Sequence, residues 1–185
     1  QAKEILHEKP KKLIAQIQEI VIKQEKRFED IYKDILAELR KEQIFLINEG
    51  QLNKEQAEFV KNHFQKNVRH VLVPIMMSAI GKVPYLKDKS IYLAIKLIKN
   101  GEPQQVDYAL IEVPTDFVSR FLVLPQIGDK KYIILLDDVI RHCLPDVFSI
   151  FQYDSIEAYT VKMTRDAELD IDNDLSKSFV EKLSE

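Results

Sequence analysis

The hydrophobic residues change their spacing once along the chain, and this change constrains the fold more than any other feature. Over residues 11–42 the apolar side chains recur at steps of three and four, the period of an amphipathic helix. Over residues 91–97 they alternate with period two, as in a strand with one buried face. Helices followed by strands that short turns connect predict an α+β fold rather than alternating βαβ units.

The helix predicted over residues 11–42 carries a narrow apolar stripe of the coiled-coil kind. Glutamate and lysine fill its other faces, and Gln24 interrupts the stripe. Because so long a stripe must be buried, the helix needs a partner, either a second helix of this chain or a helix of another subunit. The stripe consists of Leu13, Ile17, Ile20, Phe28, Ile31, Ile35 and Leu39.

A second helix is predicted to begin at Asn53. The Asn53 side chain can cap the helix, Gln56 can reach back to the cap, and Leu52 supplies an apolar residue just before it. We expect this helix to end before Pro74. Its buried side should consist of Ala57, Val60, Phe64 and Val68.

The remaining pattern predicts further strands, a short helix and a last helix. The short helix is expected to start with Asp137 as its cap and to close at Pro145, and the last helix covers about residues 172–183. We therefore expect a long N-terminal helix pair and one mostly antiparallel sheet flanked by short helices. A helical arm and connection (residues 1–52) would precede an α+β domain (residues 53–185). The further strands are predicted at residues 106–113, 121–124, 132–136 and 156–163.

Composition excludes several classes of function. Four scattered glycines cannot form a phosphate-cradling loop, and the lone Cys143 forms neither an internal disulfide nor a cysteine-cluster zinc site. A net charge of −3 predicts no nucleic-acid partner. The longest apolar stretch, residues 71–80, is too short to cross a membrane, and no signal peptide is visible, so we expect a cytoplasmic protein. A chain that opens on Gln1 inside an approaching helix is expected to be an excised fragment.

The histidines form no recognisable catalytic or metal site. His63 and His70 share a helix face, but neither has a ligand at the i+4 spacing that zinc requires, and no third ligand lies near in the sequence. His142 and Cys143 are adjacent helical positions, which do not face each other, so Cys143 is expected in the core. His7 has no partner set either. We expect no catalytic residue and no metal ligand in this chain.

The acidic C-terminal end allows two interpretations. Residues 166–185 hold seven acids and two lysines, and five of their side chains match positions of a calcium-binding loop. However, Leu175 stands where that loop needs glycine, and Lys177 stands at a position that is usually apolar. Acids at the start of a helix also favour its dipole, which is the simpler interpretation. The five matching residues are Asp170, Asp172, Asp174, Ser178 and Glu181.

A strand that carries Lys162 and Arg165 runs directly into these acids. Alternation sets Lys162 on the face opposite Val161. Arg165 then stands at the strand end, where it can reach a ligand or a neighbouring domain. The alternative is a surface ion pair with Asp166 or Glu168. Lys162 and Arg165 are the candidate residues for facing a ligand or another domain.

Five segments in the same order resemble the middle, or head, domain of bacterial polyphosphate kinase. The resemblance runs from about Arg27 to the end of the chain, and its most specific pieces are IEVPTDFVSRFLVLP and KMTRDAELD. The segments are RFEDIYKDILAELRKEQIFLI, GQLNKEQAEFVKNHFQKNVRHVLVPIM, YALIEVPTDFVSRFLVLP, YIILLDDVIRHCLPDVF and VKMTRDAELDID.

This resemblance implies a parent enzyme that transfers the terminal phosphate of ATP to inorganic polyphosphate, with magnesium and a phosphorylated histidine. The parent would be cytoplasmic or peripherally membrane-associated, without a transmembrane segment, and a homodimer or higher oligomer. In this family the head domain takes part in dimerisation. The phosphohistidine and the phosphate-binding arginines belong to the other domains, so no catalytic residue transfers to this chain.

Two functions follow as hypotheses. The first is a non-catalytic scaffold that holds subunits together through the helix of residues 11–42 and positions the remaining domains of the same enzyme. The second is a free-standing interaction module that binds an unrelated helix with the same stripe. The two differ in whether the partner of the stripe is a second copy of the protein.

Overall fold

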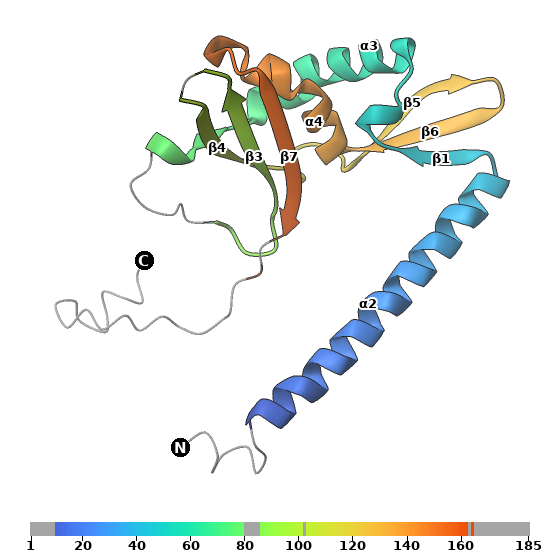
Figure 1. Ribbon diagram of the computed structural model, residues 1–185. Coiled ribbons are helices and arrows are strands. Elements are labelled where there is room, and N and C mark those ends of the chain that lie inside the picture. Colours follow the sequence, from blue (N-terminus) through green and yellow to red (C-terminus); the bar gives the residue numbers. More distant parts are fainter. Residues whose placement is uncertain (1–9, 80–85, 102, 163, 165–185) are drawn as a thin grey trace, which may run out of the picture.

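A computed structural model describes residues 10–79, 86–101, 103–162 and 164. One long helix projects from a body in which two small sheets and two shorter helices share a core (Figure 1). The elements in chain order are α2 (Pro10–Lys41), β1 (Ile44–Ile47), α3 (Lys54–His63), β2 (Ile75–Met76), β3 (Ile91–Lys99), β4 (Gln105–Glu112), β5 (Phe121–Ile127), β6 (Lys130–Leu135), α4 (Leu136–Val147) and β7 (Ser155–Lys162). Short turns of 3-10 helix lie among them, including η1 (Glu49–Gln51).

The strands form two sheets, where the sequence pattern predicted one. The first sheet has the order β1-β6-β5, and the second has the order β2-β4-β3-β7. All strand pairs are antiparallel except β1 with β6, so the mostly antiparallel prediction is confirmed. The first sheet is the β5–β6 hairpin extended by residues 44–47, which pair with β6 in parallel. Phe45 stacks on Tyr132 across this pairing, with ring centroids 5.5 Å apart.

The core confirms the period-two pattern of β3. Leu93, Ile95 and Leu97 are fully buried against residues of both shorter helices. Val60, Phe64 and Val68 supply the expected apolar side of the second helix, which continues beyond α3 as a π-helical turn over Phe64–Val68. Burial of these aliphatic and aromatic side chains is the main stabilising contribution to the body.

The N-terminal cap of α3 is the one the sequence predicts. The Asn53 Oδ1 atom accepts from the Gln56 backbone N–H at 2.8 Å, and Gln56 Oε1 accepts from the Asn53 N–H at 3.2 Å. The same reciprocal arrangement joins Asn48 and Gln51 at η1. At the first residues of α3 and of η1, two backbone N–H groups that have no partner inside the helix are thus hydrogen-bonded by side chains. These bonds fix the residue at which each helix begins.

The helix α4 differs from the sequence prediction at both ends. Leu135 occupies the cap position without a side-chain cap bond, so Asp137 lies inside the first turn and is not the cap. Pro145 lies inside the helix, which ends at Val147. Proline in the last turn removes a single hydrogen bond, and the Phe148 N–H still donates to the Leu144 carbonyl at 3.0 Å.

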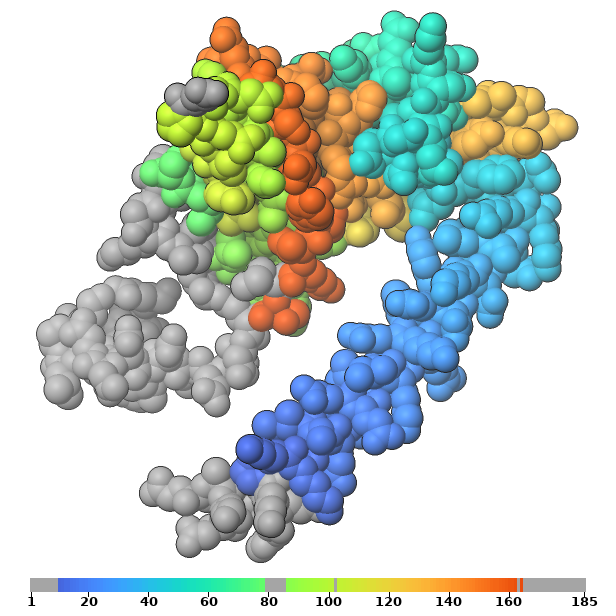
Figure 2. Space-filling model, in the orientation of Figure 1, coloured from blue at the N-terminus to red at the C-terminus, as the bar shows by residue number. Residues whose placement is uncertain are grey.

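Both predicted N-terminal helices are present, but α2 does not pack along α3 in the described residues. None of the residues of α2 is buried, and within the described residues it contacts the body chiefly through β1. In the space-filling view α2 stands away from the body along most of its length (Figure 2). Of the two partners that the stripe allows, a second helix of this chain is therefore excluded among the described residues.

Candidate functional site

The apolar side chains of α2 form the largest candidate contact surface. They lie along one side of the helix and face solvent, and Phe28 is 71% exposed. Phe28 stacks on Tyr32 with parallel rings 6.4 Å apart, so even its aromatic contact stays within the helix. Exposed apolar residues in contiguous patches mark contact surfaces. The exposed members on this side are Ile14, Ile17, Ile20, Val21, Phe28, Ile31, Tyr32 and Ile35, and Ile22 is also exposed but lies away from them around the helix.

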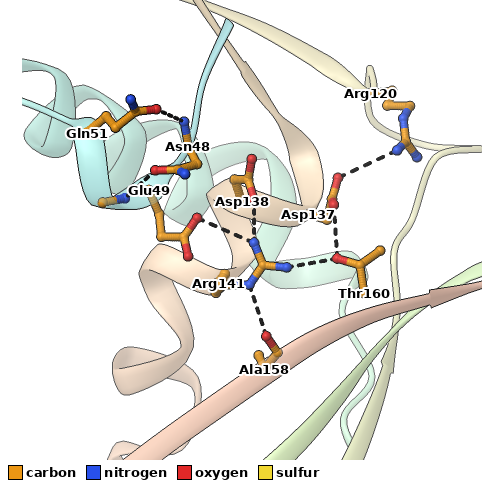
Figure 3. A network of polar contacts seen from close by, with 10 residues as sticks. Asn48, Glu49, Gln51, Arg120, Asp137, Asp138, Arg141, Ala158 and Thr160 are labelled. Carbon is orange, nitrogen blue, oxygen red and sulfur yellow. Dashed lines mark hydrogen bonds and ion pairs between the residues drawn. The ribbon is translucent and has the colours of Figure 1, made fainter. Parts of the chain in front are cut away.

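A polar network around Arg141 lies where the two sheets meet (Figure 3). The Arg141 guanidinium donates to the Ala158 carbonyl oxygen at 3.3 Å and to Thr160 Oγ1 at 2.8 Å, both on β7. It also donates to Asp138 on its own helix and to Glu49 Oε2 in η1 at 3.4 Å. One side chain thus joins the connection after β1, helix α4 and the last strand of the second sheet.

Asp137 extends this network to the first sheet. Thr160 Oγ1 donates to Asp137 Oδ2 at 3.1 Å, and Arg120 Nη2 lies 3.8 Å from Asp137 Oδ1. Arg120 directly precedes β5, so the ion pair connects α4 to the hairpin of β5 and β6. The carboxylate is almost fully buried. Its Oδ2 atom accepts from the hydroxyl, whereas Oδ1 accepts no hydrogen bond within the described residues and has only the ion pair with Arg120.

Asp138 is the member of the network whose pKa is raised. Burial raises its pKa to about 6, and the neighbouring charges of Asp137 and Glu49 act in the same direction. Arg141 opposes the shift by its charge and its hydrogen bond. Three carboxylates and two guanidinium groups thus lie close together in a partly buried region, where Arg141 stabilises the ionised form of Asp138. The arrangement can fix the relative orientation of elements, and it offers no nucleophile.

Cys143 lies in the core, as the sequence predicts. Burial lowers the pKa of His63 and of His142, and Cys143 is fully buried, with burial raising its pKa to about 12. A thiol with such a pKa stays protonated at neutral pH and is no nucleophile. Within the described part of the chain, no group of three or more acidic, histidine or cysteine side chains could hold a metal ion. His7 and the proposed calcium residues lie outside the described residues.

Of the two candidate ligand-facing residues, the structure describes only Lys162. It ends β7, pairs with Ile91 of β3 and is exposed. Strand alternation sets it on the same face as Thr160, two residues from the Arg141 network. Arg165 lies outside the described residues.

The Arg141 network was missed by sequence reasoning. One local signal exists, because two consecutive aspartates precede an arginine at i+3 in a helix that is otherwise apolar on that side. The other partners have no local signal: Glu49 is 92 residues from Arg141, and Thr160 is 19 residues away.

In the part of the chain that the structure describes, no helix is long and apolar enough to span a membrane.

Residues 55–185 match the sequence profile of a protein family, the polyphosphate kinase middle domain. The polyphosphate kinase of Vibrio vulnificus (strain YJ016) is 38% identical over 179 residues, which are 95% of this chain and 25% of the relative. That of Escherichia coli (strain K12) is 39% identical over 176 residues, 93% of this chain and 25% of the relative.

A solved structure of a polyphosphate kinase is also similar to this chain. The crystal structure of polyphosphate kinase from Porphyromonas gingivalis superposes with a TM-score of 0.77 at 27% identity, over 91% of this chain and 26% of that one. The chain therefore spans about a quarter of the length of the curated relatives it matches.

Proposed function

Because the chain belongs to the polyphosphate kinase middle domain family, we propose that it works as a non-catalytic scaffold within an enzyme that transfers the terminal phosphate of ATP to polyphosphate. ATP, magnesium and the phosphorylated histidine would be handled by the three-quarters of the relatives' length that this chain does not span. We propose a cytoplasmic setting for that enzyme. The scaffold has two tasks, which are holding two subunits together and orienting the catalytic domains.

The observation that carries the first task is the unburied stripe of α2. A helix of 32 residues with none buried has little to stabilise it except its own hydrogen bonds and surface ion pairs such as Lys23 with Glu19. A second copy of α2 laid along the stripe would remove these side chains from water, at roughly 25 cal/mol for each Å² of apolar surface. We therefore propose that α2 contacts α2, or another part of the arm, in a homodimer.

The second task falls to the body, which we propose as a head domain of residues 53–185 behind an arm of residues 1–52. The pairing of β1 with β6 anchors the end of the arm in the body, and Arg141 links η1 to β7. The two ends of the scaffold are thus connected by hydrogen bonds rather than by a loose linker. We propose that Lys162 and Arg165, at the end of β7, face the catalytic domains.

The dimer proposal is tested by size-exclusion chromatography with light scattering on the full-length enzyme. Ile17→Asp combined with Ile31→Asp places two charges in the stripe and is expected to give the monomer mass. Ala15→Asp combined with Ala37→Asp adds the same charges on the opposite side of α2 and is expected to leave the dimer intact. Alanine favours the helix more than isoleucine does, so the control substitutions cost α2 more helix propensity than the stripe substitutions do. A dimer that survives in the control therefore shows that loss of helix propensity is not what separates the subunits.

A dimer that persists in the stripe variant contradicts the proposal. The same stripe would also suit a free-standing module that binds an unrelated helix. In that case the wild-type protein is a monomer and gains mass only when a foreign amphipathic helix is added.

A further inference from the structure

The second sheet has one covered face and one open face. The side chains that point into the core alternate along β3 and β4 with a second set that points the other way. On the open face the central rung consists of Tyr159 of β7, Ala94 of β3 and Leu110 of β4, which are direct cross-strand partners. Tyr159 is 61% exposed and Tyr108, also on this face, is 54% exposed.

A groove of about 260 Å³ runs over this rung. Ala94 forms its floor, because a small side chain there stands between the larger Tyr159 and Leu110 on the neighbouring strands. Met77 and Tyr108 also line the groove, and its lining is apolar. On one side Lys96 and Glu157 form an ion pair with 3.6 Å between Nζ and Oε2.

A second hollow continues the open face toward β2. It has a volume of about 480 Å³ and includes Ile75, the cross-strand partner of Leu110, together with Tyr92. Tyr92 is buried and yet does not belong to the main core cluster, and its hydroxyl accepts from the Lys87 N–H at 2.8 Å. Val73 and Phe117, both largely exposed, complete its apolar part. Lys87, Glu112 and Asp116 also line this hollow, and Lys87 forms an ion pair with Glu112, so the second hollow is mixed in character and the apolar surface is concentrated in the groove over Ala94.

We propose that another domain of the same polypeptide packs on this open face and inserts an aliphatic or aromatic segment into the groove over Ala94. The inference rests on the proposed function and names the surface through which the scaffold would orient the catalytic domains. The occupant is argued from length, because about three-quarters of the relatives' chains lie outside the matched region, and this is enough chain for further domains beside the segment. An apolar sheet face with a hollow is the kind of surface that a neighbouring domain buries.

A second copy of the chain fits this face poorly. If this face lay on the two-fold axis of a symmetric dimer, the groove of one copy would face the groove of the other. Two concave surfaces opposed in this way enclose a void, which forfeits the packing that stabilises an interface. The stripe of α2 is convex rather than concave. We therefore assign the second copy of the chain to the stripe and the other domain of the same polypeptide to the groove.

The test uses the full-length enzyme with p-benzoylphenylalanine, a photo-crosslinking residue, in place of Tyr159. Tyr159 is exposed in the segment, so the substitution leaves the fold of the sheet intact. After irradiation, a denaturing gel separates products of one chain mass from products of twice that mass, and mass spectrometry identifies the joined peptides. We expect a product of one chain mass that joins position 159 to a peptide outside residues 1–185.

Ser155 supplies the matched control. It lies on the same strand and the same face as Tyr159, is exposed and does not line the groove. The same photo-crosslinker at position 155 is expected to give at least five-fold less of the internal product. Equal yields at both positions overturn the groove as the contact, and so does the absence of any internal product at position 159.

The outcome is separable from that of the dimer experiment. A product of twice the chain mass that contains position 159 of one copy overturns the internal contact in favour of a second copy. The mass of the enzyme with the stripe variant Ile17→Asp and Ile31→Asp reports on α2 alone. If that variant stays dimeric and the internal product still forms, the proposed role of α2 fails and the docking surface stands.

Discussion

Two helices of this chain share an amphipathic pattern and end in opposite environments. The 12 residues of α4 include seven that are buried, whereas the 32 residues of α2 include none. The partner of α4 lies in the chain itself, where β6, β7 and α3 contact it. The difference teaches that an apolar stripe predicts the existence of a partner and says nothing about its location. The partner of α2 must be sought outside the described residues.

The comparison is tested most strongly by the same truncation in both helices. Ile140→Ala in α4 removes a fully buried side chain and is expected to lower the free energy of unfolding by about 4 kcal/mol. Ile20→Ala in α2 removes a side chain that faces water and is expected to change it by less than about 0.5 kcal/mol in the monomer. Urea denaturation of the two variants, at protein concentrations too low for the dimer to form, measures both changes in the free energy of unfolding. Similar losses at the two positions would break the comparison.

Arg141 probes the polar side of α4. Arg141→Ala removes the donor that Glu49, Asp138, Thr160 and the Ala158 carbonyl share, and should destabilise the chain by about 2 kcal/mol. Arg141→Lys keeps the charge but cannot donate in several directions at once, so it should recover less than half of the loss. Denaturation of both variants measures this, and an Arg141→Ala protein as stable as wild type would show that the network holds nothing together.

The raised pKa of Asp138 makes the stability of this network depend on pH. A carboxyl whose pKa is about 6 in the folded state and near 3.8 when unfolded binds its proton more tightly in the folded state. Its contribution to stability is therefore full below pH 4 and is lost as the pH rises through about 6. Relative to Asp138→Asn, the wild type should lose on the order of 1–2 kcal/mol between pH 4 and pH 7. A difference that is flat over this range would show that Asp138 titrates normally.

The smallest effect is expected at Lys162, whose proposed partner, like that of α2, lies outside the described residues. In the full-length enzyme, Lys162→Ala should raise the KM for polyphosphate about two- to five-fold and leave kcat almost unchanged, as loss of an exposed charge contact would do. Lys99→Ala, at the other end of the same sheet, is the matched control and should change neither constant. Equal effects of the two substitutions would remove Lys162 from the proposed interface.

Local patterns predicted the local structure well. The capping box of Asn53 and Gln56 and the alternation of Leu93, Ile95 and Leu97 depend on neighbours along the chain, and both are confirmed. The start of α4 was missed because Asp137 has the composition of a cap, yet its carboxylate is used by Thr160 and Arg120. A tertiary contact thus displaced a local preference.

The larger errors concern pairings between distant segments. The sequence carries no sign that residues 44–47 pair with residues 131–134, nor that the β5–β6 hairpin stays apart from the sheet of β2, β4, β3 and β7. The Arg141 network depends on the same kind of contact, since Glu49 reaches Arg141 only after β1 has been placed beside β6. Such contacts follow from the assembled fold rather than from the period of any one element.

Amide hydrogen exchange of α2 in the full-length enzyme, measured over a range of protein concentrations, tests the central claim most directly. A solitary helix opens readily, whereas one packed along its stripe is protected. We predict that the amides of residues 14–35 become more than ten-fold slower to exchange as the concentration rises through the range in which the dimer forms. Exchange of these amides that stays fast, or stays slow, at every concentration would contradict burial of the stripe by a second copy.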